Sequence, residues 1–244
     1  YNNRVFLIDK TGDIVTHAQI RCQLELRGLE NSLYTINTQF DTDSHYINPF
    51  KYHTGCKLLS KSVIPKPRNV NSNMKKLIMT SRIILSDLCE AIEYVNETIS
   101  ITLLIGLLQN IDELKILSDR NANNRQLTMS LTDSFINTEA IQHVISTLYA
   151  LKAEPLLSDY CEFEQSKGFM MPHKNEVDAL EAYSKGFIVY LYSASLQQSG
   201  SIVDNLITKC FKSASRKVKF SITESQRDVI DDFCNVLEEK NSRI

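Results

Sequence analysis

Residues 74–95 read MKKLIMTSRIILSDLCEAIEYV, with apolar side chains returning every three to four positions. This is the spacing of one face of an α-helix, and it predicts a single helix over the whole stretch. The central stripe consists of Leu77, Ile84, Leu88, Ala91 and Val95, and Ile78, Leu85 and Ile92 widen it. A stripe of this width predicts a helix with a large part of its surface buried.

Most of the chain after residue 68 repeats this helical pattern. Turn-forming residues are scarce there, because the chain holds only seven Gly and five Pro and three of the prolines precede residue 68. Helical spacing covers residues 99–110, 111–119, 135–152, 175–198 and 202–211. A last helix is predicted from Ser221, where Ser221-x-x-Glu224 matches a capping box and an apolar stripe with an acidic opposite face follows.

The N-terminal part has a different character. Residues 4–17 contain two β-rich runs around the turn residues 9–12, which is typical of a β-hairpin. A short helix is predicted over residues 18–29 and a third strand over residues 32–40. Residues 41–73 are polar and contain proline, so we interpret them as a connection.

These patterns predict a mainly α protein, α+β overall. A small α+β segment with a strand-containing hairpin is expected over residues 1–67, and a helical domain, a multi-helix bundle, over residues 68–244. The composition suits a folded globular chain, with 43% hydrophobic and 23% charged residues. The net charge of −2 gives no general attraction to nucleic acids or anionic membranes, so such binding would need a local patch.

The cysteines and the longest apolar run bear on location. The six cysteines are scattered without C-x-x-C spacing, which favours reduced thiols in the cytoplasm. The most apolar run, residues 99–108, is about half of the roughly twenty residues that span a bilayer. We therefore expect a cytoplasmic protein with no transmembrane segment.

Residues 9–12 read DKTG and directly follow the apolar run 5–8. They resemble the phosphorylated-aspartate loop of P-type ATPases and related phosphatases of the haloacid dehalogenase type, and the resemblance implies a nucleophilic carboxylate at a strand end. Asp13 stands where that motif has Thr, and the chain does not show the alternating strands and helices of a parallel sheet. We therefore interpret DKTG as an Asx-type hairpin turn.

A second short match is the loop Met171, Pro172, His173, Lys174 and Asn175. It resembles the signature loop of the fumarase, aspartase and argininosuccinate lyase superfamily, which implies a serine base with Lys and Asn holding the substrate's acid groups. Residues 168–170 read GFM where the family has Gly-Ser-Ser, so the serine base is absent. A capped helix start explains the same loop without catalysis, and we favour that interpretation.

The polar connection holds His45, His53 and Cys56, with Asp41 and Asp43 nearby. Imidazole, thiolate and carboxylate are all zinc ligands. The spacing His-x7-His-x2-Cys matches no standard zinc motif, and a fourth ligand would have to come from elsewhere. We interpret the segment as a surface loop and predict no metal site.

A basic segment near the C-terminus comprises Lys209, Lys212, Arg216, Lys217 and Lys219. Such a cluster can contact phosphates or an acidic partner. Positive charge at the end of a helix also suits the helix dipole, and the acidic face of the last predicted helix offers it partners within the chain. We favour this second explanation.

No Ser-His-Asp arrangement and no Gly-rich phosphate loop can be inferred, so we predict no catalytic residues and no cofactor. The wide apolar helix faces favour a non-enzymatic interaction protein, a subunit, adaptor or assembly factor in a hetero-complex with other proteins. One alternative is a degenerate member of the lyase superfamily. The other is phosphate or nucleic-acid binding through residues 209–219, although nucleic acid is not the partner we expect.

Overall fold

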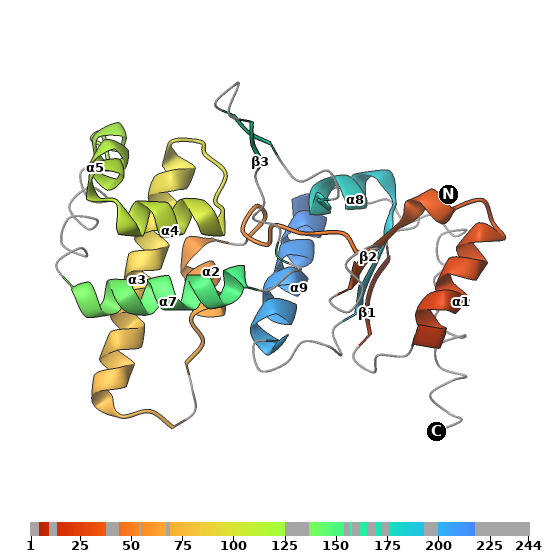
Figure 1. Ribbon diagram of the computed structural model, residues 1–244, viewed down its shortest axis with the longest axis horizontal. Helices are drawn as coiled ribbons and strands as arrows, with labels where there is room; N and C mark the ends of the chain where they lie inside the picture. Colours follow the sequence, from red (N-terminus) through yellow and green to blue (C-terminus); the bar gives the residue numbers. More distant parts are fainter. Residues whose placement is uncertain are drawn as a thin grey trace.

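The computed structural model describes residues 5–9, 14–37, 44–53, 55–66, 69–124, 137–153, 157, 162–164, 169–171, 176–192 and 200–217. Within these residues helices predominate (Figure 1), and the predicted fold class, mainly α and α+β overall, is confirmed. The elements are β1 (Val5–Asp9), α1 (Ile14–Glu25), a short 3-10 turn (Glu30–Ser32), β2 (Leu33–Asn37), α2 (Cys56–Val63), α3 (Ser72–Tyr94), α4 (Ile101–Gln109), α5 (Ile111–Arg120), α7 (Thr138–Lys152), β3 (Glu162–Glu164), β4 (Phe169–Met171), α8 (Ala179–Lys185), β5 (Ile188–Tyr192) and α9 (Gly200–Lys217).

The helical body is organised around α3, the helix predicted from residues 74–95. Helices α2 and α7 pack against α3, and α4 packs against α7. Asn71 caps α3 by accepting a hydrogen bond from the Met74 backbone N–H at 2.8 Å. Ser100, Asn110 and Asn137 cap α4, α5 and α7 in the same way, so polar residues satisfy the free amides at each of these helix starts.

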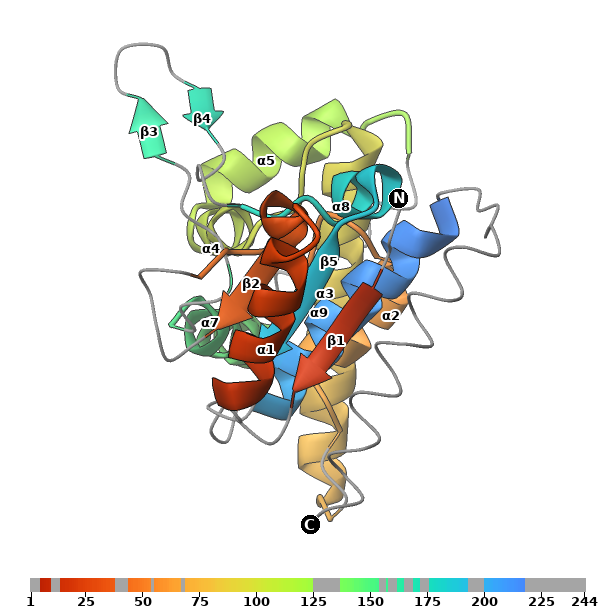
Figure 2. The same ribbon diagram turned by 90° about the vertical axis from the view of Figure 1, so that its right-hand side faces the viewer.

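A three-stranded sheet adjoins this body, in the order β1-β5-β2, and all its strands are parallel. Helix α1 covers one face and α9 lies on the other (Figures 1 and 2). Side chains of β5 alternate between the two sides: Ile188 and Tyr190 pack with α1, whereas Val189 and Leu191 belong to the main core. The Phe211 ring of α9 stacks on Phe6 of β1 with centroids 4.6 Å apart.

The predicted N-terminal hairpin is wrong. Residues 5–9 form a strand, but residues 14–17 open helix α1, and β1 pairs in parallel with β5. Parallel strands cannot be joined by a tight turn, so α1 is the connection that leads toward β2. The expectation that the chain lacks a parallel sheet is wrong for the same reason. The predicted third strand is present as β2.

The single helix predicted over residues 175–198 is also wrong. Helix α8 ends at Gly186, whose φ of 77° is the left-handed conformation that suits glycine at a helix end. The apolar run IVYLY then forms β5 at the centre of the sheet. Because β5 is buried on both faces, its sequence is an unbroken apolar run and does not alternate with polar residues. Apolar periodicity alone cannot distinguish such a strand from a segment of buried helix.

Strand β5 joins β1 and β2, so the sheet takes strands from both sides of residue 67. The division into two domains at that point stays a prediction.

The last predicted helix, after Ser221, lies outside the described residues. None of the helices in the described part of the chain is long and apolar enough to cross a membrane.

Candidate functional site

A concave surface lies on the pair α2 and α3. Their facing sides are buried, with Leu59 and Val63 of α2 and Leu85 of α3 in the main core. Arg82 of α3 ties the two helices together, because its Nε–H donates a 2.8 Å hydrogen bond to the carbonyl of Ile64 just after α2. Residues beside this seam line a groove of about 510 Å³, which we call the α2–α3 groove.

The groove has an apolar floor formed by one side of α3. Ile78 is buried, whereas Met79 is 66% exposed and Ile83 is 44% exposed. Large apolar side chains in a concave surface favour burial against a partner, because each loses its contact with water. Among the residues that line the groove there is no aromatic side chain.

The rim of the groove is strongly basic. It carries Lys57, Lys61, Lys66, Lys75 and Arg82, against a single acid, Asp87. All four lysines are exposed, and they form no ion pair with any residue that the structure describes. Sequence reasoning missed this cluster because its members come from two helices and the link between them.

The predicted basic segment lies on α9, but its side chains are not equivalent. Lys209 Nζ donates a 2.7 Å hydrogen bond to Ser62 Oγ of α2, and Lys217 Nζ lies 5.3 Å from the centroid of the Tyr52 ring. Lys212 and Arg216 are exposed. Lys219 lies outside the described residues, and the anion-binding role of the segment stays a prediction.

The two loops with family resemblances are only partly described. Met171 ends β4, and residues 172–175 lie outside the described residues, so the lyase alternative is not tested there. The helix start that we favoured for this loop is wrong in position, because α8 begins at Ala179 and Asp178 caps it. Asp9 ends β1, as a phospho-accepting aspartate would, but its Oδ2 accepts a hydrogen bond from the Tyr190 hydroxyl at 2.5 Å. Residues 10–13 are not described.

The candidate ligands of the polar connection separate into two places. His45 Nδ1 lies 3.1 Å from the backbone oxygen of Thr35, away from the other two candidates. Burial lowers the pKa of His45. His53 and Cys56 do lie together, at the start of α2, whereas Asp41 and Asp43 are outside the described residues.

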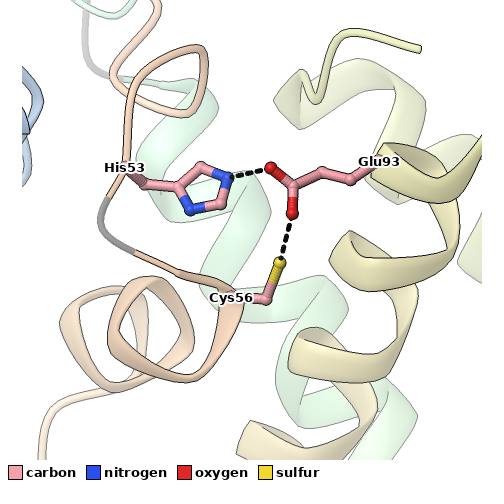
Figure 3. A group of neighbouring side chains, drawn as sticks. All are labelled: His53, Cys56 and Glu93. Carbon is pink, nitrogen blue, oxygen red and sulfur yellow. Dashed lines mark hydrogen bonds and ion pairs between the residues drawn. The ribbon is translucent and has the colours of Figure 1, made fainter. Parts of the chain in front are cut away.

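His53 and Cys56 meet a third side chain, Glu93 in the last turn of α3 (Figure 3). Glu93 Oε1 lies 3.1 Å from His53 Nε2, and Glu93 Oε2 accepts a 3.1 Å hydrogen bond from the Cys56 thiol. Burial lowers the pKa of His53 and raises the pKa of Cys56, so the imidazole is neutral and the thiol protonated at neutral pH. A protonated thiol is a poor nucleophile, so this cluster does not suit cysteine catalysis.

A further polar network joins the segment before α2 to α8. Asp178 caps α8 by accepting the backbone N–H of Leu180 at 2.9 Å and of Glu181 at 3.0 Å. Its carboxylate also accepts hydrogen bonds from the Tyr52 hydroxyl at 2.9 Å and from Lys51 Nζ at 2.5 Å. Burial works to raise the pKa of Asp178, but these donors and the Lys51 charge outweigh it, and the pKa is lowered.

Comparison with known proteins adds no family to this geometry. No family model, no curated protein and no solved structure matches the chain. The features that bear on function are therefore the α2–α3 groove and the cluster of His53, Cys56 and Glu93.

Proposed function

We propose that this protein is a non-enzymatic interaction protein, a subunit or adaptor, that binds an acidic amphipathic helix of a partner protein in the α2–α3 groove. The single observation that carries the proposal is the combination of an apolar floor with a rim of five cationic side chains and one acid. A helix with apolar residues on one side and Asp or Glu on its edges satisfies both features at once.

The dimensions of the groove agree with this occupant. Its α3 side runs from Lys75 to Asp87, thirteen residues that extend about 18 Å at the rise of an α-helix. A partner helix of three to four turns covers that length. Its apolar side would fill the floor at Met79 and Ile83, while its carboxylates face the lysines of the rim.

Two other occupants fit less well. A second copy of this chain placed symmetrically in the groove would bring one basic rim against another, which is electrostatically unfavourable. Nucleic acid would satisfy the charge, but the floor has no aromatic side chain on which bases could stack. We further propose a cytoplasmic location, supported by the four free thiols of the described part, Cys22, Cys56, Cys89 and Cys210.

Site-specific photo-crosslinking tests the proposal. A photoreactive amino acid placed at Met79, in the full-length protein in its native cells, should crosslink to a partner protein. Mass spectrometry should map the crosslink to a segment with helical apolar spacing and a net negative charge. Lys75→Glu should weaken the crosslink, and Lys76→Glu provides the matched control, because Lys76 is its exposed neighbour and does not line the groove.

Three results would overturn the proposal. One is a crosslink to a basic or non-helical segment, or to nucleic acid. Another is a crosslink to residues 221–237 of the same chain, whose own acidic amphipathic pattern would make it the occupant. The third is the absence of any crosslink from Met79 in cells where the protein is folded and expressed.

A further inference from the structure

Three side chains that can bind a metal ion lie together outside the α2–α3 groove: His53, Cys56 and Glu93. We infer that they bind one divalent transition-metal ion of the zinc type, with a fourth position left for water. The three residues come from the segment before α2, the first turn of α2 and the last turn of α3. The ion would therefore fasten the start of one helix to the end of another.

The geometry of the donor atoms fits such an ion. The three ligand atoms all lie within 4.8 Å of one another, and each Glu93 oxygen is 3.1 Å from its neighbour. With Zn–N about 2.0 Å and Zn–S about 2.3 Å, adjacent donors around a tetrahedral zinc are separated by roughly 3.3–3.6 Å. Shifts of about 1 Å or less in these side chains would create the site.

The charges also balance. One thiolate, one carboxylate and a neutral imidazole around a doubly charged cation give a net charge of zero, which a partly buried site tolerates. Without metal, the same carboxylate accepts hydrogen bonds from the imidazole Nε2–H and the thiol. The charge of nearby Lys217 acts to lower the pKa of His53 and would also repel a metal cation. Its Nζ lies over the Tyr52 ring, 5.3 Å from the centroid.

Exposure explains the open position. The side chain of Glu93 is 51% exposed, whereas that of His53 is only 8% exposed. Water can therefore reach the ion from the Glu93 side. Three protein ligands with one position open to solvent is the arrangement of zinc sites that bind or activate a small ligand, whereas purely structural sites are closed by four protein ligands.

Binding requires a defined movement of protons. The Cys56 thiol must release one proton to solvent when its sulfur ligates the metal. His53 Nδ1 now accepts a 3.1 Å hydrogen bond from the Gly55 backbone N–H, so its ring proton is on Nε2. Ligation through Nε2 moves that proton to Nδ1 and breaks the bond to Gly55. One zinc ion therefore displaces one net proton and changes the tautomer of His53.

Metal analysis and cobalt substitution test the inference on the full chain. Protein purified without chelator should contain about one equivalent of zinc. After the zinc is removed, Co²⁺ should bind with a thiolate-to-cobalt charge-transfer absorption. Cys56→Ser should abolish that absorption, and Cys22→Ser should leave it unchanged, because Cys22 is a free, exposed thiol on α1. Nitrogen NMR of His53 should show the tautomer change on zinc addition.

Loss of metal binding by Cys56→Ser could also result from misfolding, because Cys56 is buried. Glu93→Gln controls for this, since the Glu93 side chain is half exposed and can change without disturbing the core. It should weaken Co²⁺ binding by more than about tenfold, the loss typical of removing even an outer partner of a metal site. At the same zinc concentration it should also reduce the rise in melting temperature that zinc gives the parent protein. The inference is overturned if the parent binds no stoichiometric metal, if bound cobalt lacks the thiolate absorption, or if Glu93→Gln binds as tightly as the parent.

Discussion

At the scale of single residues, Asp178 shows how one carboxylate can connect several parts of the fold. It caps α8 and receives hydrogen bonds from Tyr52 and Lys51. Because its pKa is lowered in the folded state, the charged form is favoured by folding. Its stabilising contribution is therefore present above the unfolded pKa of about 3.9 and is lost as the pH falls through the lower folded value.

Asp178→Asn should test this contribution. The amide oxygen can still cap α8, so the change removes mainly the charge. We expect the variant to unfold about 0.5–1 kcal/mol more easily than the parent at pH 7, a modest value because Lys51 is partly exposed. Urea unfolding at falling pH should show this difference begin to shrink below about pH 4 and disappear only below the lowered pKa of folded Asp178.

The matched control is Asp112→Asn, since the Asp112 side chain is 88% exposed and pairs only loosely with Lys115 at 3.5 Å. This variant should differ little from the parent at any pH. An Asp178→Asn effect that persists unchanged at low pH would contradict the electrostatic explanation.

Residues of this kind are hard to predict from sequence. The capping role of Asn71 is local, because donor and acceptor are three positions apart. Glu93 and Asp178 are different: their partners are 37 and 126 positions away along the chain. A glutamate on the outer side of a helix has the same sequence pattern whether it faces solvent or a histidine and a cysteine.

At the scale of elements, the long periodic helices were predictable and the sheet was not. Helix α3 was predicted over residues 74–95 and extends over residues 72–94, since its stripe is long and its position depends on local spacing. Strand β1 pairs with β5, which comes much later in the sequence, at residues 188–192. The sequence of a short apolar strand does not indicate which distant strand it pairs with. The next apolar run, at residues 14–17, was therefore predicted to be its partner in a hairpin.

Gly186 marks the junction between α8 and β5 that sequence reasoning overlooked. Its φ of 77° is costly for a residue with a Cβ, so Gly186→Ala should destabilise the protein by about 1 kcal/mol or more. Chemical denaturation measures the change.

Gly106→Ala gives a control of opposite sign. Gly106 is inside α4, and an added Cβ there would meet only Glu113 Oε2, at an ordinary contact distance of 3.7 Å. Alanine favours helix, so this variant should be neutral or more stable by up to about 1 kcal/mol. Equal destabilisation by both changes would show that the left-handed conformation of Gly186 is not the cause.

The cap of α3 offers a second test at this scale. Asn71→Ala removes the oxygen that accepts the Met74 N–H and should cost about 1 kcal/mol of the unfolding free energy. Asn73→Ala, an exposed position within the first turn of the same helix, should be neutral or slightly stabilising. A cap effect no larger than that of Asn73→Ala, measured by thermal unfolding, would argue against the capping role.

At the scale of the whole molecule, partner binding can be tested separately from catalysis. Substituting both His173 and Lys174 by Ala should leave partner binding intact, because the proposed function does not use the lyase-like loop. Co-purification of the partner with the double variant checks this. Loss of function in a well-folded double variant, together with turnover of a fumarate-releasing substrate by the parent, would favour the lyase alternative.

The most direct test of the central claim is the size of the native assembly. By size-exclusion chromatography of the endogenous protein, the parent should elute in a complex much heavier than a single copy of the protein. Ile83→Asp places a charge on the groove floor and should release the protein as a monomer. Ile116→Asp, at an isoleucine of α5 that is also exposed but does not line the groove, should leave the complex intact. A parent protein that elutes as a monomer, or an Ile83→Asp variant that remains in the heavy complex, would contradict the account.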